Sequence, residues 1–198
     1  MTKISAILLA AGLSSRMEGP NKLLLEFKNH TIVEQCYSSL SKSGVDEIIV
    51  VTGRDAEIVS GLLRLRQQDR LVHNADFRLG LTTSIQKGVK QAHGDAFMLC
   101  LADMPLLNMD HYDSLIEEFQ TSAMADQEAI LAPFVNGKRG NPVIFSKVHK
   151  PAILAHNEMN GCRSLINHNL NHFIRYNTED HAFLSDIDTA EDYSLLNQ

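Results

Sequence analysis

Short hydrophobic runs alternate with amphipathic stretches along most of the chain. The runs have the length and apolar composition of buried strands. They occupy residues 4–9, 47–52, 71–74, 94–105, 129–135, 142–145 and 172–176. The stretches between them repeat apolar positions every three to four residues, which predicts helices with one buried face. These helices are expected at residues 31–44, 55–66, 82–91, 108–120, 161–166 and 189–197.

This alternation is typical of βαβ units, so the fold class is α/β with a mostly parallel sheet. No repeat or linker divides the chain, and we expect one Rossmann-like three-layer domain over residues 1–198, with helices on both faces of the sheet. Residues 136–141 between two strands suggest a hairpin-like excursion, and residues 183–188 an extended segment. Apolar face positions are expected at Ile32, Val33, Cys36, Tyr37 and Leu40, and at Ile58, Val59, Leu62 and Leu63.

Helix ends are also readable. Thr31 and Glu34 have the spacing of a capping box, and Gly44 is placed to end the helix that they start. Asn108 is a candidate cap for the helix that runs to about Gln120.

Composition is that of an ordinary globular protein, with 44% hydrophobic and 21% charged residues. No apolar run approaches the roughly 20 residues of a membrane span, and the N-terminus lacks a secretory pattern, so we expect a cytoplasmic protein. The net charge of −6 argues against a nucleic-acid platform. Three cysteines, Cys36, Cys100 and Cys162, and nine scattered histidines indicate neither a disulfide framework nor a zinc site.

The first apolar run breaks into a loop of small residues that is followed by two cations. Leu9 ends the run, and Ala10, Ala11 and Gly12 lack bulk, so that a ligand can approach the backbone. Loop amides can bind anionic oxygens, while Arg16 supplies a planar fork and Lys22 a point charge. We interpret this loop as a polyphosphate cradle. The alternative is an ordinary strand-to-helix turn with solvated cations.

Asp103 stands at the end of an apolar strand, where an unpaired carboxylate is costly unless it meets a cation. Mg²⁺ is the natural partner, with a second carboxylate from Asp186 or Asp188, since it prefers one or two carboxylates plus phosphate oxygens. The alternatives are a turn residue for Asp103 and a helix N-cap for Asp188. Because ligands bind beyond the carboxyl ends of strands, Asp103 and the loop should share one crevice.

Three further cations suit an anionic second substrate. Lys138 and Arg139 lie between two glycines, either as a flexible clamp or as a solvated hairpin tip. Arg163 follows Gly161 at a helix start, where an anion would already be favoured.

Taken together, these segments resemble the MobA-like nucleotidyltransferase superfamily and, within it, the molybdenum cofactor cytidylyltransferase (MocA-type) group. The resemblance spans nearly the whole chain. It is carried by residues 9–17, 20–24, 51–53, 73–77, 80–84, 101–105, 140–145, 161–165 and 186–189.

The resemblance implies a CTP-dependent transfer of CMP to the phosphate of a molybdenum-bearing molybdopterin, with Mg²⁺ as cofactor. CTP would lie over residues 9–12, with Gly53, Asn74 and Ser84 near its base and ribose. The acceptor would contact Lys138, Arg139, Asn141 and Arg163, and Arg16, Lys22 and Asp103 would serve the transfer. A molybdoenzyme of the xanthine dehydrogenase type would receive the product.

Guanylyl-transferring relatives tend to have Leu-Ala-Gly-Gly where this chain has Leu9-Ala10-Ala11-Gly12, so the methyl of Ala11 is a candidate base selector. The chain departs from the group at Glu18, Asn141 and Ala190, which bears mainly on the acceptor. Two alternatives remain: a cytidylyltransferase for a small sugar or alcohol phosphate, and a non-catalytic nucleotide- or pterin-binding maturation factor.

Overall fold

A computed structural model describes residues 2–17 and 19–196, so Glu18 lies outside the described residues. The chain forms one mixed sheet in the order β10-β7-β9-β6-β1-β4-β5, with β8 paired to β7. Its strands are β1 (Ile4–Ala10), β4 (Glu47–Thr52), β5 (Arg70–His73), β6 (Ala96–Leu101), β7 (Ile130–Val135), β8 (Lys138–Arg139), β9 (Val143–Ser146) and β10 (Phe173–Thr178). A separate hairpin pairs β2 (Glu26–Phe27) with β3 (His30–Thr31). Within the mixed sheet, the pairings are parallel except those of β8 and β9, and the β2–β3 hairpin is antiparallel.

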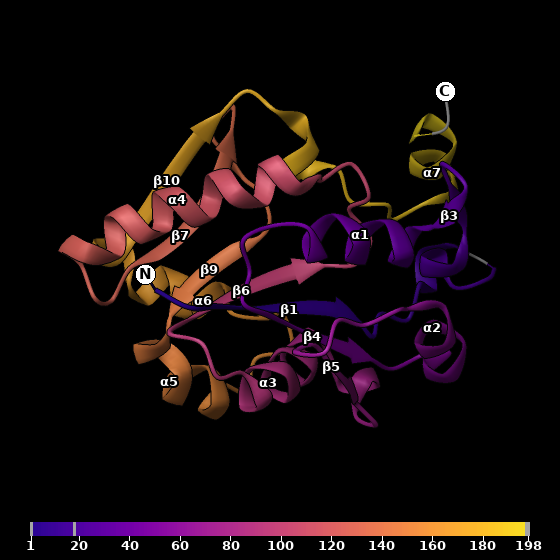
Figure 1. Cartoon of the computed structure of the whole chain (residues 1–198), viewed down its shortest axis with the longest axis horizontal. Helices are drawn as coiled ribbons and strands as arrows, with labels where there is room; N and C mark the ends of the chain where they lie inside the picture. Colours follow the sequence, from indigo (N-terminus) through magenta and orange to yellow (C-terminus); the bar gives the residue numbers. More distant parts are fainter. Residues whose placement is uncertain (1, 18, 197–198) are drawn as a thin grey trace.

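Helices cover both faces of the sheet, as expected from the sequence. Figure 1 shows α1 and α4 on one face, and α3 and α5 on the other. The α-helices are α1 (Ile32–Ser41), α2 (Ala56–Leu62), α3 (Leu81–Gln91), α4 (Met109–Ala125), α5 (Lys150–Ala155), α6 (Arg163–His168) and α7 (Ala190–Leu196). Short 3-10 turns join them: η1 (Ser15–Met17), η2 (Lys22–Leu24), η3 (Phe77–Leu79), η4 (Lys147–His149), η5 (Leu170–His172) and η6 (His181–Leu184).

Each face of the sheet has its own hydrophobic core. Every residue of β1 is buried, and alternate side chains enter opposite cores: Leu8 packs with Phe119 on the α1 and α4 side, and Ile7 with Val89 on the α3 side. Cys100 is 1% exposed and packs as a small hydrophobe, as the sequence indicated. This two-sided burial explains why β1, β4 and β6 are continuous apolar runs.

The helix starts agree with the sequence better than the helix ends. The Thr31 and Glu34 capping box is present, and Asn108 caps α4 in a reciprocal pair with His111. The expectation that Gly44 ends α1 is wrong: the helix stops at Ser41, and Lys42 at its end keeps a right-handed conformation. No left-handed residue is therefore needed there.

Two other predicted segments differ. The helix expected at residues 55–66 ends at Leu62, and Ile58 is 56% exposed instead of inward, while Val59 is fully buried. Residues 183–188 do not form an extended strand, because η6 begins the segment and the chain then continues without strand pairing. The hairpin β2–β3 and helix α5 had no counterpart in the sequence analysis.

The sheet order creates one topological switch point. From β1 the chain moves through α1 to β4 and β5 on one side, and then returns to β6 on the other side of β1. The carboxyl ends of β1 and β6 therefore diverge into loops on either side of one crevice, which is where ligands bind in sheets of this kind. Within the described residues, no helix is both long and apolar enough to cross a membrane.

Candidate active site

The loop after β1 is open where a ligand would approach. A Cβ built on Gly12 would have no protein atom within 4 Å, and Ser14 takes a left-handed conformation with φ of 51°. Arg54 stabilises the loop from the β4 side: its guanidinium donates to the carbonyls of Leu13 at 2.6 Å and Gly19 at 3.3 Å. Arg54 thus fixes the backbone of the loop on one side, while the space beside Gly12 holds no protein atom.

Asn21 fixes the start of the turn that carries Lys22. Its side chain is 1% exposed, accepts from the backbone amide of Leu23 at 3.1 Å, and donates to Asp55 at 3.2 Å. The amide of Lys22 in turn donates to the hydroxyl of Ser14 at 3.2 Å. Lys22 therefore leaves the loop in a defined direction, toward the end of β6.

Lys22 meets the acidic residues that the sequence analysis assigned to the same crevice. Its ammonium lies 2.5 Å from Oδ2 of Asp103 and 3.1 Å from Oδ1 of Asp188, and donates to the carbonyl of Ile187 at 2.6 Å. Arg16 reaches the other oxygen of Asp188, with 2.8 Å between Nη1 and Oδ2. The fold thus brings together both cations and two of the three carboxylates. The most distant pair in the sequence, Arg16 and Asp188, is separated by 172 residues.

The cluster holds more negative than positive charge. Burial, opposed by Lys22, raises the pKa of Asp103 above its ordinary value. Burial and the nearby carboxylates of Asp103 and Asp188 raise the pKa of Asp186. Burial alone would lower the pKa of Lys22, but Asp103 and Asp188 more than compensate, and the pKa is raised. Three carboxylates against two cations favour an additional positive charge at this site.

One carboxylate oxygen in the cluster has no partner. Oδ1 of Asp103 is buried without a hydrogen bond, although buried oxygens are normally satisfied. Among the described residues, no set of three His, Cys, Asp or Glu side chains is already arranged to hold a metal, because Lys22 lies between Asp103 and Asp188. The donor chemistry nevertheless fits a hard cation: free carboxylate oxygens in a site with excess negative charge.

Two adjoining hollows open at this edge of the sheet and share Leu9, Leu81 and Leu101 in their walls. We call the first, of about 230 Å³, the donor hollow and the second the acceptor hollow, after the substrates that the sequence predicts for their residues; Ala11, Gly12, Ser84 and Asp103 are among the residues that line the first. The second measures about 190 Å³. The polar residues that line it are Arg139, Asn141, Asn160 and Arg163, and its other lining residues are largely apolar.

Three of the proposed nucleotide contacts lie behind the donor hollow rather than in its wall. The side chain of Ala10 is buried in the core beneath α1. Gly53 is covered, since a Cβ there would lie 2.7 Å from Phe77 and 2.9 Å from the methyl of Ala11. Asn74 is fully buried, and its amide donates to Thr83 and to Ser84, both at 2.9 Å. The other proposed nucleotide contacts, Leu9, Ala11, Gly12 and Ser84, line the hollow, and Asn74 orients Ser84.

The acceptor hollow contains a pair of arginines without an acidic partner. Burial and the positive charge of Arg163 lower the pKa of Arg139. Among residues 2–17 and 19–196, no carboxylate pairs with either guanidinium. Lys138 is exposed and lies outside the hollow, because neighbours on a strand such as β8 point to opposite faces. Two guanidinium groups that line one hollow without a carboxylate partner are suited to binding an anion.

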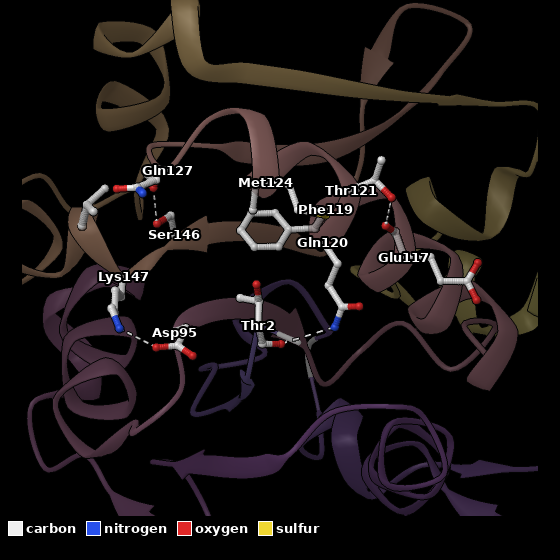
Figure 2. Close-up of a pocket in the computed structure, with 12 residues that line it drawn as sticks. Thr2, Asp95, Glu117, Phe119, Gln120, Thr121, Met124, Gln127, Ser146 and Lys147 are labelled. Atoms are coloured by element: carbon white, nitrogen blue, oxygen red, sulfur yellow. Dashed lines mark hydrogen bonds and ion pairs between the residues drawn. The ribbon is translucent and has the colours of Figure 1, made fainter.

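A larger hollow than these two lies elsewhere. It measures about 990 Å³ and lies near the amino ends of the strands, with Thr2, Asp95, Gln120 and Lys147 in its walls (Figure 2). Asp95 and Lys147 satisfy each other, and Gln120 donates to the Thr2 carbonyl. No residue proposed for chemistry lines it, so size does not identify the functional site here.

Some residues that shape the site were missed from the sequence. Arg54 and Asn21 hold the loop, and Thr82 holds the segment before Arg163. Asn21 had a signal, because it directly precedes Lys22 and has the side chain of a cap. Arg54 and Thr82 had none, since their partners are distant along the chain.

Comparison with known proteins places the chain among nucleotidyltransferases. Residues 6–173 match the family model described as the MobA-like NTP transferase domain. The chain is 29% identical over 194 residues to the molybdenum cofactor cytidylyltransferase of Escherichia coli (strain K12), covering 98% of this chain and 95% of that protein. It is 27% identical to the purine catabolism protein PucB of Bacillus subtilis (strain 168), over 96% and 94% of the two chains. It is also 27% identical to the nicotine blue oxidoreductase of Paenarthrobacter nicotinovorans, over 76% and 74%.

Solved structures agree on the fold. Rv0371c from Mycobacterium tuberculosis H37Rv superposes with a TM-score of 0.83 at 23% identity, covering 100% of this chain and 99% of that one. The same protein in complex with manganese gives a TM-score of 0.75 at 20% identity, over 99% and 98% of the chains.

Proposed function

The chain belongs to the MobA-like NTP transferase family, and we propose that it transfers CMP from CTP to the phosphate of a molybdenum-bearing molybdopterin, releasing pyrophosphate. One observation carries this proposal. Arg16 and Lys22 from the loop after β1 meet Asp103 and Asp188 at the carboxyl edge of the sheet, beside an open backbone at Gly12. Cations, carboxylates and free amides at one point are what a nucleoside triphosphate requires.

In the proposed reaction, a phosphate oxygen of the acceptor attacks the α-phosphorus of CTP. A new phosphorus–oxygen bond forms, the bond to the bridging oxygen of the β-phosphate breaks, and pyrophosphate leaves with the electron pair. The protein supplies positioning and charge, and no covalent intermediate on a side chain is needed. Arg16 and Lys22 neutralise the negative charge that accumulates on the leaving pyrophosphate.

A divalent cation fits the residues present. Asp103 would hold it through the unpaired Oδ1, together with Asp186 or Asp188, and Mg²⁺ is the proposed ion. When bound, it would neutralise negative charge on the phosphate groups of the nucleotide. The manganese complex of the structural relative supports a divalent ion in this fold. Lys22 then exchanges carboxylates for phosphate oxygens as its partners.

The walls of the acceptor hollow bear on the choice of acceptor. Its floor is formed by aliphatic and aromatic side chains such as Ile85, Val143 and Phe145, which offer no partners for hydroxyl groups. A hydroxyl group placed against these apolar side chains would lose its hydrogen bonds to water without replacement, at a cost of about 1–3 kcal/mol, and would find partners only near Arg139, Asn141, Asn160 and Arg163. A flat ring system can place its faces against the apolar side chains and its polar edge toward Asn141 and Asn160, with an anionic group at Arg139 and Arg163. This favours the pterin phosphate over a small sugar or alcohol phosphate.

The named relatives also include proteins of purine catabolism and nicotine metabolism, so the alternatives need a direct test. The measurement is pyrophosphate release from CTP and Mg²⁺ with molybdopterin, a sugar phosphate and an alcohol phosphate as acceptors. Release with molybdopterin alone supports the proposal. Release with a sugar or alcohol phosphate alone would replace the acceptor. Tight CTP or pterin binding without release would indicate a carrier that delivers its ligand to a molybdoenzyme of the xanthine dehydrogenase type.

A further inference from the structure

We propose that Thr82, at the start of α3, is a positioning residue that sets the acceptor hollow against the donor hollow. The inference rests on the proposed function, because it concerns which substrate each side of α3 serves. Its evidence is independent of that function: a set of contacts between α3 and residues 153–161.

Thr82 is 6% exposed, and its hydroxyl uses both its donor and its acceptor capacity on one segment. It donates to the carbonyl of Glu158 and accepts from the amide of Gly161 at 3.0 Å. The neighbouring amide of Leu81 donates to the carbonyl of Met159 at 3.1 Å. The first turn of α3 is therefore joined to residues 158–161 by three hydrogen bonds.

Two further contacts hold the same segment from its other end. The side-chain amide of Gln86, one turn further along α3, donates to the carbonyls of Ile153, Leu154 and His156 at 2.6–3.2 Å. His156 in turn bonds the carbonyl of Gly161 through Nε2 at 2.7 Å. Residues 156–161, which lie between α5 and α6, are thus held in place by hydrogen bonds to α3.

Backbone geometry at the contact leaves little tolerance. Gly161 has φ of +72°, and a Cβ there would lie 3.1 Å from Leu81 and 3.3 Å from Ile85. Gly80 has φ of +112°, with the carbonyl of Met159 at 2.8 Å from a Cβ position. Gly80 permits a close approach of its backbone to that of Met159, and Gly161 leaves room for the side chains of Leu81 and Ile85. Gly161 and Arg163 then form part of the wall of the acceptor hollow.

The opposite side of the same helical turn serves the donor hollow. Thr83 accepts from Asn74, and Ser84 both accepts from Asn74 and lines the donor hollow. Successive residues of one turn therefore contact different halves of the site. Displacing residues 158–161 should therefore disturb the acceptor more than the nucleotide, whose hollow they approach only through Gly80 and Leu81.

The test compares Thr82→Val, Thr82→Ser and Thr83→Val with the wild-type chain, using pyrophosphate release with CTP, Mg²⁺ and molybdopterin. Thr82→Val keeps the shape but removes both hydroxyl contacts. We expect a rise of roughly ten-fold in the KM for molybdopterin, with kcat and the KM for CTP within about two-fold of wild type. Thr82→Ser should restore wild-type values. Thr83→Val should instead raise the KM for CTP.

Thr121→Val is the matched control, because Thr121 is exposed on α4, its hydroxyl donates to the helix carbonyl of Glu117, and it lies away from both hollows. Unchanged constants in Thr82→Val, or equal losses for both substrates with a lowered Tm, would overturn the inference and leave the proposed function standing. Absence of turnover in the wild type would instead reject the proposed function. In that case the inference is tested by the binding of inorganic phosphate. Its Kd should rise in Thr82→Val but not in Thr83→Val. Equal Kd values for the two variants would overturn the inference.

Discussion

The ammonium of Lys22 lies 2.5 Å from Oδ2 of Asp103, which joins the loop after β1 to the end of β6. Both side chains are largely shielded from solvent, with 10% and 16% of their side-chain surface exposed. The pair is not a closed unit, because Asp188 also contacts Lys22 and Oδ1 of Asp103 has no partner. It is therefore better described as part of a charged cluster that is prepared for a ligand.

Asp103→Asn should separate activity from stability. Burial raises the pKa of Asp103, so the ionised carboxylate is less favourable in the fold than in the unfolded chain at neutral pH. Lys22 keeps Asp188 and the Ile187 carbonyl as partners. We expect pyrophosphate release to fall at least about 100-fold, while the free energy of unfolding stays equal or rises. Urea denaturation and turnover are the measurements, and Asp110→Asn on exposed α4 is the control. A large loss of stability would contradict this account of the cluster.

Alanine substitutions at Gly12 and Gly53 should affect different properties: CTP affinity at Gly12 and stability at Gly53. A methyl at Gly12 meets no protein atom, so Gly12→Ala should fold normally and bind CTP at least about ten-fold more weakly, because the methyl enters ligand space. A methyl at Gly53 meets Phe77 and Ala11 below 3 Å, so Gly53→Ala should lose about 1–3 kcal/mol of unfolding free energy.

Denaturant midpoints and CTP titration distinguish the two variants of Gly12 and Gly53. Gly61→Ala, also in open space but on α2, should be slightly stabilised with unchanged CTP affinity. Normal CTP binding by Gly12→Ala would remove the loop from the donor site.

The acceptor arginines yield a third prediction. Arg139→Gln and Arg163→Gln should each raise the KM for the anionic acceptor by roughly ten- to a hundred-fold, since each loses a charge-assisted contact worth about 1.5–3 kcal/mol. The KM for CTP should change little. Lys138→Gln is the matched control, because Lys138 neighbours Arg139 on β8 but points away from the hollow. An equal effect in Lys138→Gln would support the flexible clamp considered from the sequence.

Features that depend on local pattern and sheet topology could be predicted from the sequence, whereas contacts between residues that are distant in the sequence could not. The strand-to-loop pattern around Gly12 and the acid after β6 were readable, because a parallel sheet brings carboxyl ends together without further information. That topology placed Asp103 and the loop that carries Lys22 in one crevice, but the direct pairing of Lys22 with Asp103 was not predicted. Lys138 and Gly53 were harder, since their placement depends on strand pairing and on the packing of Phe77. Contacts such as Arg54 with the Leu13 carbonyl leave no mark in local sequence.

Ala11 tests base selection. Its methyl lies in the wall of the donor hollow and faces Gly53, so that Ala11→Gly widens the space beside the nucleotide. We expect the ratio of kcat/KM for GTP over CTP to increase several-fold, with a loss of about 0.8 kcal/mol in stability from the removed methyl. Competition between the two nucleotides at fixed acceptor measures this ratio. No increase in relative GTP use would show that the base is selected elsewhere.

Asp69 provides the last prediction, on stability and pH. Its side chain has no exposed surface and accepts four hydrogen bonds: from Tyr37 at 2.7 Å, from the amide of Ile48 at 2.8 Å, and from Arg66 at 2.9 and 3.0 Å. Burial alone would raise the pKa of Asp69, but these donors outweigh it and lower the pKa. The same network and burial raise the pKa of Tyr37 to about 12.

Because the pKa of Asp69 is lower in the folded protein, its carboxylate stabilises the fold at pH values above the unfolded-state pKa of about 4. This contribution is lost as the pH falls through the pKa of the folded state. Asp69→Asn places an amide NH₂ against two donors, so at pH 7 it should cost about 3–5 kcal/mol. The difference from wild type should shrink as the pH falls from 5 toward 2, because the wild-type carboxylate also becomes protonated. Urea unfolding across this range measures it, with exposed Asp110→Asn as control. A difference independent of pH would mean that shape, and not charge, makes Asp69 important.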